Sequence, residues 1–247
     1  MEEPQNVYDD PGFLAGYAGL DRFGVGWPEA MEQPALLALL PPVQGLRVVD
    51  LGCGAGQLAV HLANAGATAV LALDVSEQML ALARAERSHP RVTYRHQSIE
   101  DTDLPSEQTD LVVSTLAFHY VADYAGLVRR VARSLVPGGW LVFSTEHPIY
   151  TARLPDLGWA LDADGQRHGW TIDHYADEGE RTEHWFVEGV RKYHRTVSSL
   201  INGLLGAGLT LERIVEPTPS DEFLRHKPDA IDERRRPMFL LLRARRD

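Results

Sequence analysis

The sequence predicts an α/β protein with a doubly wound, mostly parallel sheet and helices on both faces. From Leu46 onward, short apolar runs alternate with stretches of helical period, a pattern typical of parallel strands joined by crossover helices. The first run passes into a glycine-rich turn at 52–56, where a strand would meet a helix. At 247 residues and 44% apolar content, the chain can bury a large core.

Five strand–helix units are expected in order along the core. Gly66 follows the first helix as a stop, Ser76 is a suitable N-cap for the second, and Pro137-Gly138-Gly139 breaks the chain before the fifth strand. The expected strands span 47–51, 70–73, 92–96, 111–114 and 140–144, and the expected helices span 57–65, 77–87 and 124–135.

The segments that flank this core differ from it in composition. The N-terminal part is aromatic and ends in a helical pattern stopped by Pro41-Pro42, whereas 147–195 is polar, lacks strong periodicity and resembles an insertion. A helix at 196–207 and apolar runs at 209–215 and 238–242 follow, and Arg234-Arg235-Arg236 is interpreted as a solvated turn. We therefore expect one domain, 1–247, divided into an N-terminal segment (1–44), a core (45–146), an insertion (147–195) and a C-terminal part of the sheet (196–247).

Charge and cysteine content restrict the class of partner. The formal net charge of −11 argues against affinity based on nucleic-acid phosphates or an anionic membrane. The single cysteine, Cys53, cannot form an internal disulfide, and no apolar stretch reaches membrane-spanning length. We expect a cytoplasmic protein with a small-molecule substrate, without nucleic-acid or membrane partners, and either a monomer or a homodimer.

The glycine-rich turn is the most informative motif. In Val48-Val49-Asp50-Leu51-Gly52-Cys53-Gly54-Ala55-Gly56, an apolar strand turns through three glycines, which permit positive φ and close approach of a ligand to the backbone. The dinucleotide fingerprint requires its third glycine at position 57, where this chain has Gln57. Asp50 would repel a pyrophosphate but attract a cofactor that carries an ammonium and a sulfonium.

These residues resemble motif I of the class I S-adenosylmethionine-dependent methyltransferases. The resemblance implies a Rossmann-like fold of seven strands, with the last strand, near 238–242, antiparallel between the fifth and sixth. It implies S-adenosylmethionine as cofactor, S-adenosylhomocysteine as product, and direct in-line transfer of the methyl group to a small molecule. Asp74 stands where the family places the acid that binds the ribose hydroxyls, and Ser98 where it often has an adenine-binding Asp.

The resemblance extends to further positions around the cofactor. Residues near Thr115 and Leu116 correspond to the segment that faces the methionine amine, and aromatic residues of the flanking segments correspond to a lid and a substrate cap. The expected cofactor-binding set is Tyr8, Tyr17, Asp50, Gly52, Cys53, Gly54, Gly56, Asp74, Val75, Met79, Ser98, Ile99, Thr115 and Leu116. Further candidates for a pocket wall are Trp27, Trp159, Trp170 and Trp185, and Arg22 is a candidate partner for the cofactor carboxylate.

The acceptor side offers four candidates for a base or for acceptor positioning: His119, Glu146, His147 and His194. His119 follows the fourth strand, Glu146 and His147 follow the fifth, and His194 precedes the late helix. These positions are expected to converge on one end of the sheet, and histidine titrates in the appropriate pH range. Methyl transfer from a sulfonium needs no metal in principle, and none is expected. The alternatives are a methyltransferase acting on tRNA or protein, a cofactor-binding protein without catalysis, and, last, an NAD-dependent oxidoreductase.

Overall fold

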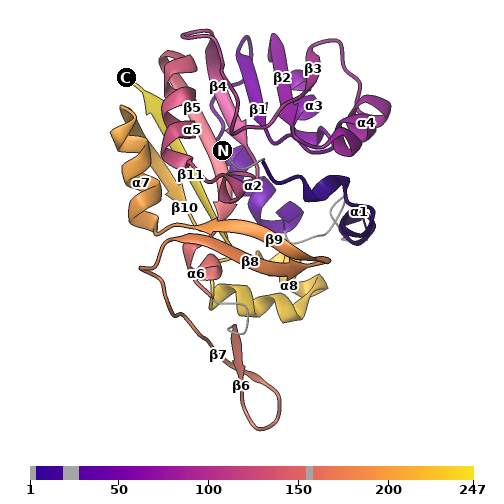
Figure 1. The fold of residues 1–247 in the computed structure, drawn as a ribbon, viewed down its shortest axis with the longest axis vertical. Coiled ribbons are helices and arrows are strands. Elements are labelled where there is room, and N and C mark those ends of the chain that lie inside the picture. The colour runs from indigo at the N-terminus through magenta and orange to yellow at the C-terminus, as the bar shows by residue number, and fades with distance from the viewer. Residues whose placement is uncertain (1–3, 19–27, 154–157) are drawn as a thin grey trace.

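The computed structural model describes residues 4–18, 28–153 and 158–247 and centres on a seven-stranded sheet (Figure 1). The strand order is β10-β11-β5-β4-β1-β2-β3, and β11 alone runs antiparallel to its neighbours. The strands are β1 (Arg47–Leu51), β2 (Ala69–Asp74), β3 (Val92–His96), β4 (Thr109–Ser114), β5 (Leu135–Glu146), β10 (Leu209–Val215) and β11 (Phe239–Arg246). This mostly parallel sheet with an antiparallel strand between β5 and β10 is the predicted Rossmann-like methyltransferase fold.

Helices cover both faces of the sheet and divide the core into two layers. One layer packs inward residues of β1, β4 and β5 against α5 (Tyr124–Ser134) and α7 (Val197–Gly206). The other packs the alternate residues of these strands against α2 (Gln33–Leu39), α3 (Gln57–Asn64) and α4 (Glu77–Glu86). Side chains along a strand alternate between faces, so a strand buried on both faces reads as a continuous apolar run.

Local signals fix where these elements begin and end. Ser76 caps α4 by accepting a hydrogen bond from the Met79 amide at 3.1 Å, as predicted. The predicted break at Pro137-Gly138-Gly139 lies instead inside β5, where the register with β4 shifts between Thr109 and Leu111. The bulge lets β5 begin earlier than the apolar pattern indicates.

Two antiparallel hairpins form most of the inserted segment. They pair β6 (Trp159–Leu161) with β7 (Arg167–Trp170), and β8 (Gly179–Trp185) with β9 (Val187–His194), after the short helix α6 (Pro148–Thr151). The β8–β9 hairpin crosses the body of the molecule in front of the central sheet, whereas β6–β7 extends away from it (Figure 1). Neither hairpin was expected from the polar sequence of this segment.

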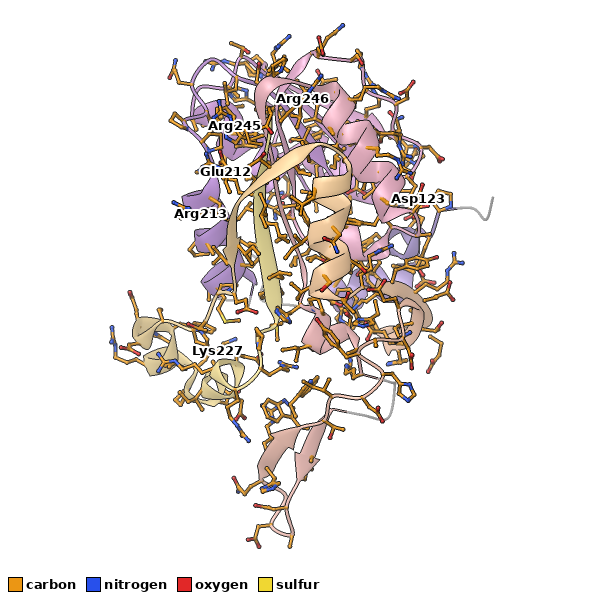
Figure 2. All side chains as sticks on the ribbon, turned by 90° about the vertical axis from the view of Figure 1, so that its left-hand side faces the viewer. Asp123, Glu212, Arg213, Lys227, Arg245 and Arg246 are labelled. Carbon is orange, nitrogen blue, oxygen red and sulfur yellow. The ribbon has the colours of Figure 1, made fainter. Side chains whose placement is uncertain are left out.

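The region before β11 also departs from expectation. Arg236 is 4% exposed, pairs with Glu233 at 2.5 Å and stacks on Trp170 at 4.3 Å, so the predicted solvated turn is wrong for this residue. It follows α8 (Asp221–His226) and the 3-10 helix η4 (Pro228–Arg234). The outer edge strand β10 carries Glu212 and Arg213, labelled in Figure 2, and such charges discourage pairing with another chain.

Candidate cofactor and acceptor site

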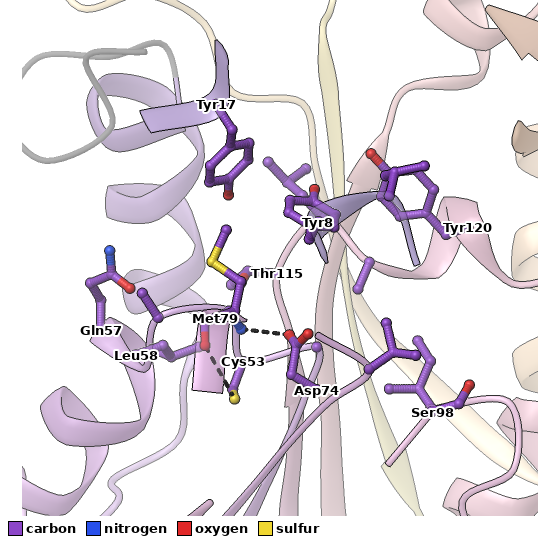
Figure 3. A pocket seen from close by; sticks show the side chains of 18 of the residues that line it. Tyr8, Tyr17, Cys53, Gln57, Leu58, Asp74, Met79, Ser98, Thr115 and Tyr120 are labelled. Atoms are coloured by element: carbon purple, nitrogen blue, oxygen red, sulfur yellow. Dashed lines mark hydrogen bonds between the residues drawn. The ribbon is translucent and has the colours of Figure 1, made fainter. Parts of the chain in front are cut away.

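A cavity of about 260 Å³ opens at the carboxyl ends of β1, β2 and β4. This is the edge at which open α/β sheets bind ligands. Figure 3 shows Tyr17, Tyr8 and Tyr120 on one side and Cys53, Asp74 and Ser98 on the other. Twelve of the fourteen predicted cofactor-binding residues line it: Tyr8, Tyr17, Gly52, Cys53, Gly54, Asp74, Val75, Met79, Ser98, Ile99, Thr115 and Leu116.

The glycine turn forms the floor of this cavity. The amides of Gly52 and Cys53 both donate to the Leu73 carbonyl at 2.9 Å, which ties the turn to the end of β2. Gly52, Gly54 and Gly56 have φ of 77°, 52° and 84°. A residue with a side chain would be strained at these positive φ values, whereas glycine adopts them freely. A Cβ at Gly54 would meet nothing within 4 Å, so the backbone here leaves space for a ligand.

Asp74 connects the turn to the next strand. One carboxylate oxygen accepts from the Gly54 amide at 2.8 Å (Figure 3). The other accepts from the Ser76 amide at 2.9 Å. Burial raises the pKa of Asp74, while these amide hydrogen bonds oppose the shift. Each carboxylate oxygen retains a further lone pair, so the side chain can still receive two hydroxyl groups.

Asp50, on β1, and Gly56, at the end of the turn, are not among the residues that line the cavity. The Asp50 carboxylate is fully buried, and neither oxygen has a hydrogen-bond partner in the described part of the chain. Burial, with a contribution from Asp74, raises the pKa of Asp50 to about 7. An orphaned carboxylate and a second one at the cavity wall fit a cofactor that carries positive charge better than one that carries a pyrophosphate.

A short N-terminal segment, residues 4–10, crosses the cavity and is called the strap below. At one end Gln5 exchanges two hydrogen bonds with the backbone of Arg191 on β9, at 3.1 and 2.7 Å. At the other, Asp9 accepts from the Ser76 hydroxyl at 2.6 Å, beside Asp74. The strap therefore joins the inserted segment to the end of β2 across the cavity.

Aromatic rings cover the cavity beneath and beside the strap. Tyr8 contacts Tyr17 at 5.0 Å and Tyr120 at 6.4 Å between ring centroids, and Tyr17 in turn contacts Trp185 at 6.3 Å. Trp159 and Trp170 pack in a separate cluster with Arg236. The candidates Arg22 and Trp27 lie outside the described residues.

The four acceptor-side candidates surround the end of β5 instead of lining the large cavity. His147 caps α6 through the Ile149 amide and pairs with Glu216 at 2.8 Å, and burial lowers its pKa despite that partner. His194 contacts Thr151 at 2.8 Å and the Tyr175 carbonyl at 2.9 Å, so both of its ring nitrogens are occupied.

Of these four candidates, His119 and Glu146 lie beside each other. The His119 Nδ1 accepts from the Glu146 amide at 3.4 Å, and its ring packs on that of Tyr120, a cavity residue, at 4.3 Å. Glu146 pairs through Oε1 with Lys192 at 2.7 Å, while its Oε2 is buried without a partner in the described structure. His119 therefore lies between Glu146 and Tyr120, which lines the cofactor cavity.

Other residues of the site were not predicted from the sequence. Lys192 is isolated in a polar stretch that shows no strand pattern. The remaining unpredicted cavity residues come from the strap, α1 (Pro11–Ala18), α2 with the π-helix before it (Pro28–Glu32), the glycine turn with α3, α4, and the segments after β3 and β4. Examples are Gln5, Glu32, Gln33, Glu100 and Ala117. No motif marks them, because their contribution depends on how the flanking segments pack over the sheet.

Comparison with known proteins identifies the class to which this fold and site belong. A family model described as a methyltransferase domain matches residues 49–143. A crystal structure of an S-adenosylmethionine-dependent methyltransferase from Mesorhizobium loti is 48% identical with a TM-score of 0.82, covering 87% of this chain and 97% of that chain. An uncharacterised protein from Haemophilus influenzae is 33% identical over 253 residues, covering 100% of this chain and 99% of its own.

The chain belongs to the S-adenosylmethionine-dependent methyltransferases, and S-adenosylmethionine is its cofactor. A ubiquinone biosynthesis O-methyltransferase from Bradyrhizobium diazoefficiens is 39% identical over 103 residues, which cover 41% of this chain and 40% of the relative. Among the described residues, no helix has the length and apolar character needed to cross a membrane. The described residues also contain no cluster of three or more side chains suited to hold a metal ion.

Proposed function

We propose that this enzyme methylates a small molecule that binds between the cofactor cavity and the inserted segment. The observation that carries the proposal is the enclosure of the cavity by the strap and the tyrosines, which leaves room for a small acceptor rather than a macromolecular surface. The net charge of −11 gives no support to RNA as substrate. The similarity of the core to a ubiquinone biosynthesis O-methyltransferase also favours a small, flat acceptor.

The chain's own residues act by binding and orienting. When bound, S-adenosylmethionine supplies a methyl group already activated by a sulfonium, so positioning provides much of the acceleration. Asp74 would hold the ribose hydroxyls, and the glycine turn with Thr115 and Leu116 would lie along the methionine part. The tyrosines would exclude water from the acceptor, and a proton acceptor is required only if the methylated atom carries a proton.

Glu146 is the candidate that the geometry favours for contact with the acceptor. His147 and His194 use both ring nitrogens in contacts with the protein, whereas Glu146 retains a buried oxygen without a partner among the described residues. The pair with Lys192 fixes the side chain without engaging that oxygen. Release of S-adenosylhomocysteine with a metabolite panel tests the function, and cofactor binding without turnover would favour a non-catalytic binding protein.

The placement of the cofactor is tested at Asp74. Replacement Asp74→Ala leaves charge-assisted hydrogen bonds unmade, and we expect S-adenosylmethionine to bind about 1–3 kcal/mol more weakly. Titration calorimetry measures the affinity, and circular dichroism checks that the fold survives. The exposed Asp101→Ala is the matched control and should bind the cofactor like the parent. Unchanged affinity in Asp74→Ala would remove Asp74 from the site.

A further inference from the structure

A second, much smaller recess lies where the β8–β9 hairpin meets the end of β5. It measures about 20 Å³ and is lined by Glu146, Tyr150, Thr151, Arg153, Arg181, Thr182, Glu183 and Lys192. A space of this size accommodates one water molecule or one small polar group when it offers two or more polar partners. Its chemistry therefore depends on which of its polar atoms are already engaged.

Two carboxylates, Glu146 and Glu183, and three cationic side chains, Arg153, Arg181 and Lys192, line the recess. Lys192 is 5% exposed and contacts both Glu146 and Glu183, and Glu183 also pairs with Arg153 at 3.2 Å. Burial opposes the charge of Lys192, but the two carboxylates outweigh it and raise its pKa. The Lys192 cation is therefore committed to its two carboxylates, whereas the guanidinium of Arg181 donates to the Asp177 and Glu180 carbonyls.

Two buried atoms of the recess residues lack partners in the described structure. Glu146 Oε2 is a hydrogen-bond acceptor, and Arg181 Nε is a donor whose neighbouring guanidinium nitrogens contact the Asp177 and Glu180 carbonyls. Leaving buried polar atoms unsatisfied destabilises the folded protein, so both atoms favour a hydrogen-bonding partner. A hydroxyl group donates one hydrogen bond and accepts others, so its chemistry matches an acceptor and a donor that line the same recess.

The recess adjoins the cofactor cavity through two aromatic partitions. Trp185 lies 5.0 Å from the Lys192 ammonium and contacts Tyr17 of the cavity, while His119 lies between Glu146 and Tyr120. Leu116, which follows β4, lines the cavity. Its amide donates to the hydroxyl of Ser144 on β5 at 3.0 Å. Trp185 and His119 therefore stand between the recess and the cavity, and an acceptor that reaches both spaces must pass beside one of these rings.

Resting on the proposed function, we propose that this recess anchors a hydroxyl group of the methyl acceptor, which donates to Glu146 and accepts from Arg181. Lys192 and Glu183 act as positioning residues that hold Glu146 in place. The acceptor class is a hydroxyl-bearing small molecule, and the seated hydroxyl is its anchor. A water molecule takes the same position when no acceptor is bound.

The test compares three probes that share one ring: catechol, guaiacol and veratrole, which present two, one and no hydroxyl groups. Calorimetry is performed on the complex with S-adenosylhomocysteine. We expect catechol to bind at least tenfold more tightly than veratrole, and Glu146→Gln to reduce this ratio below about threefold while affinity for S-adenosylhomocysteine stays within twofold. The exposed Glu188→Gln on the same hairpin is the matched control and should keep the ratio.

A second variant, Arg181→Lys, tests the proposal independently in case Glu146→Gln does not fold. Arg181→Lys keeps the positive charge but removes the Nε donor, and we expect it to lower the catechol preference at least threefold. Equal binding of the three compounds, no binding by any of them, or an unchanged ratio in both variants overturns the proposal and leaves a water site only. If the hydroxyl preference holds but no small molecule is methylated, the recess stands and the proposed function fails.

Discussion

Among single residues, Asp50 has the most unfavourable environment for a charged group. Its carboxylate is fully buried, lacks a hydrogen-bond partner among the described residues and lies near Asp74. The pKa of about 7 in the folded protein exceeds the ordinary value of 3.8, so the folded state binds this proton more tightly than the unfolded chain. Since the proton is lost as pH rises through 7, ionised Asp50 lowers the stability of the ligand-free protein.

This linkage gives a prediction for Asp50→Asn. The folded parent binds more protons than its unfolded chain between about pH 4 and 7, so Asp50 makes the free energy of unfolding fall with rising pH in that window. We expect the stability of the variant relative to the parent to increase with pH by up to about 4 kcal/mol. Urea unfolding at pH 4 to 8 measures the difference, with Asp101→Asn as the control. Parallel curves for Asp50→Asn and parent would contradict it.

At the scale of elements, the glycine turn depends on close packing against β3. A Cβ at Gly56 would lie 2.4 Å from the Tyr94 hydroxyl, and φ is 84°. Gly45 has nearly the same φ of 83°, but a Cβ there meets nothing within 4 Å. The two positions therefore separate backbone strain, which they share, from steric contact, which only Gly56 has.

We expect Gly45→Ala to lower the free energy of unfolding by about 1 kcal/mol, the cost of positive φ for a side chain. Gly56→Ala should cost at least about 2 kcal/mol more, because overpacking adds to the strain. It should also weaken S-adenosylhomocysteine binding at least tenfold by displacing the turn. Chemical unfolding and calorimetry on both variants check this. Equal losses of stability would mean that Tyr94 moves aside without cost.

The elements that could be predicted from the sequence are those that are buried on both faces. The central strands are apolar on both faces, and their runs and the Ser76 cap are visible in the sequence. Strands β8 and β9 are mostly half-buried or exposed and carry many charged residues, so their sequence does not distinguish them from a loop. Lys192 belongs to this stretch, and its place beside Glu146 depends on tertiary packing that local patterns do not encode.

For the molecule as a whole, the strap is the feature that joins otherwise separate parts. Gln5 binds the backbone of β9 in the inserted segment, while Asn6 and Asp9 bind the loop after β2, through the Val75 carbonyl at 3.2 Å and the Ser76 hydroxyl. Since these contacts lie outside the sheet, the strap can release without unfolding the core. The cofactor cavity would then open by breaking a few hydrogen bonds and the ring contacts of Tyr8 with Tyr17 and Tyr120.

This arrangement predicts a kinetic effect of Gln5→Ala, which removes both hydrogen bonds to β9. Their loss should weaken strap closure by about 1.4 kcal/mol, and we expect S-adenosylhomocysteine to dissociate about tenfold faster. The free energy of unfolding should change by less than about 1 kcal/mol, because local opening does not require the core to melt. Stopped-flow measurement of cofactor release, with the exposed Gln108→Ala as control, tests the effect. A dissociation rate equal to that of the parent would mean that the cofactor leaves by a route the strap does not cover.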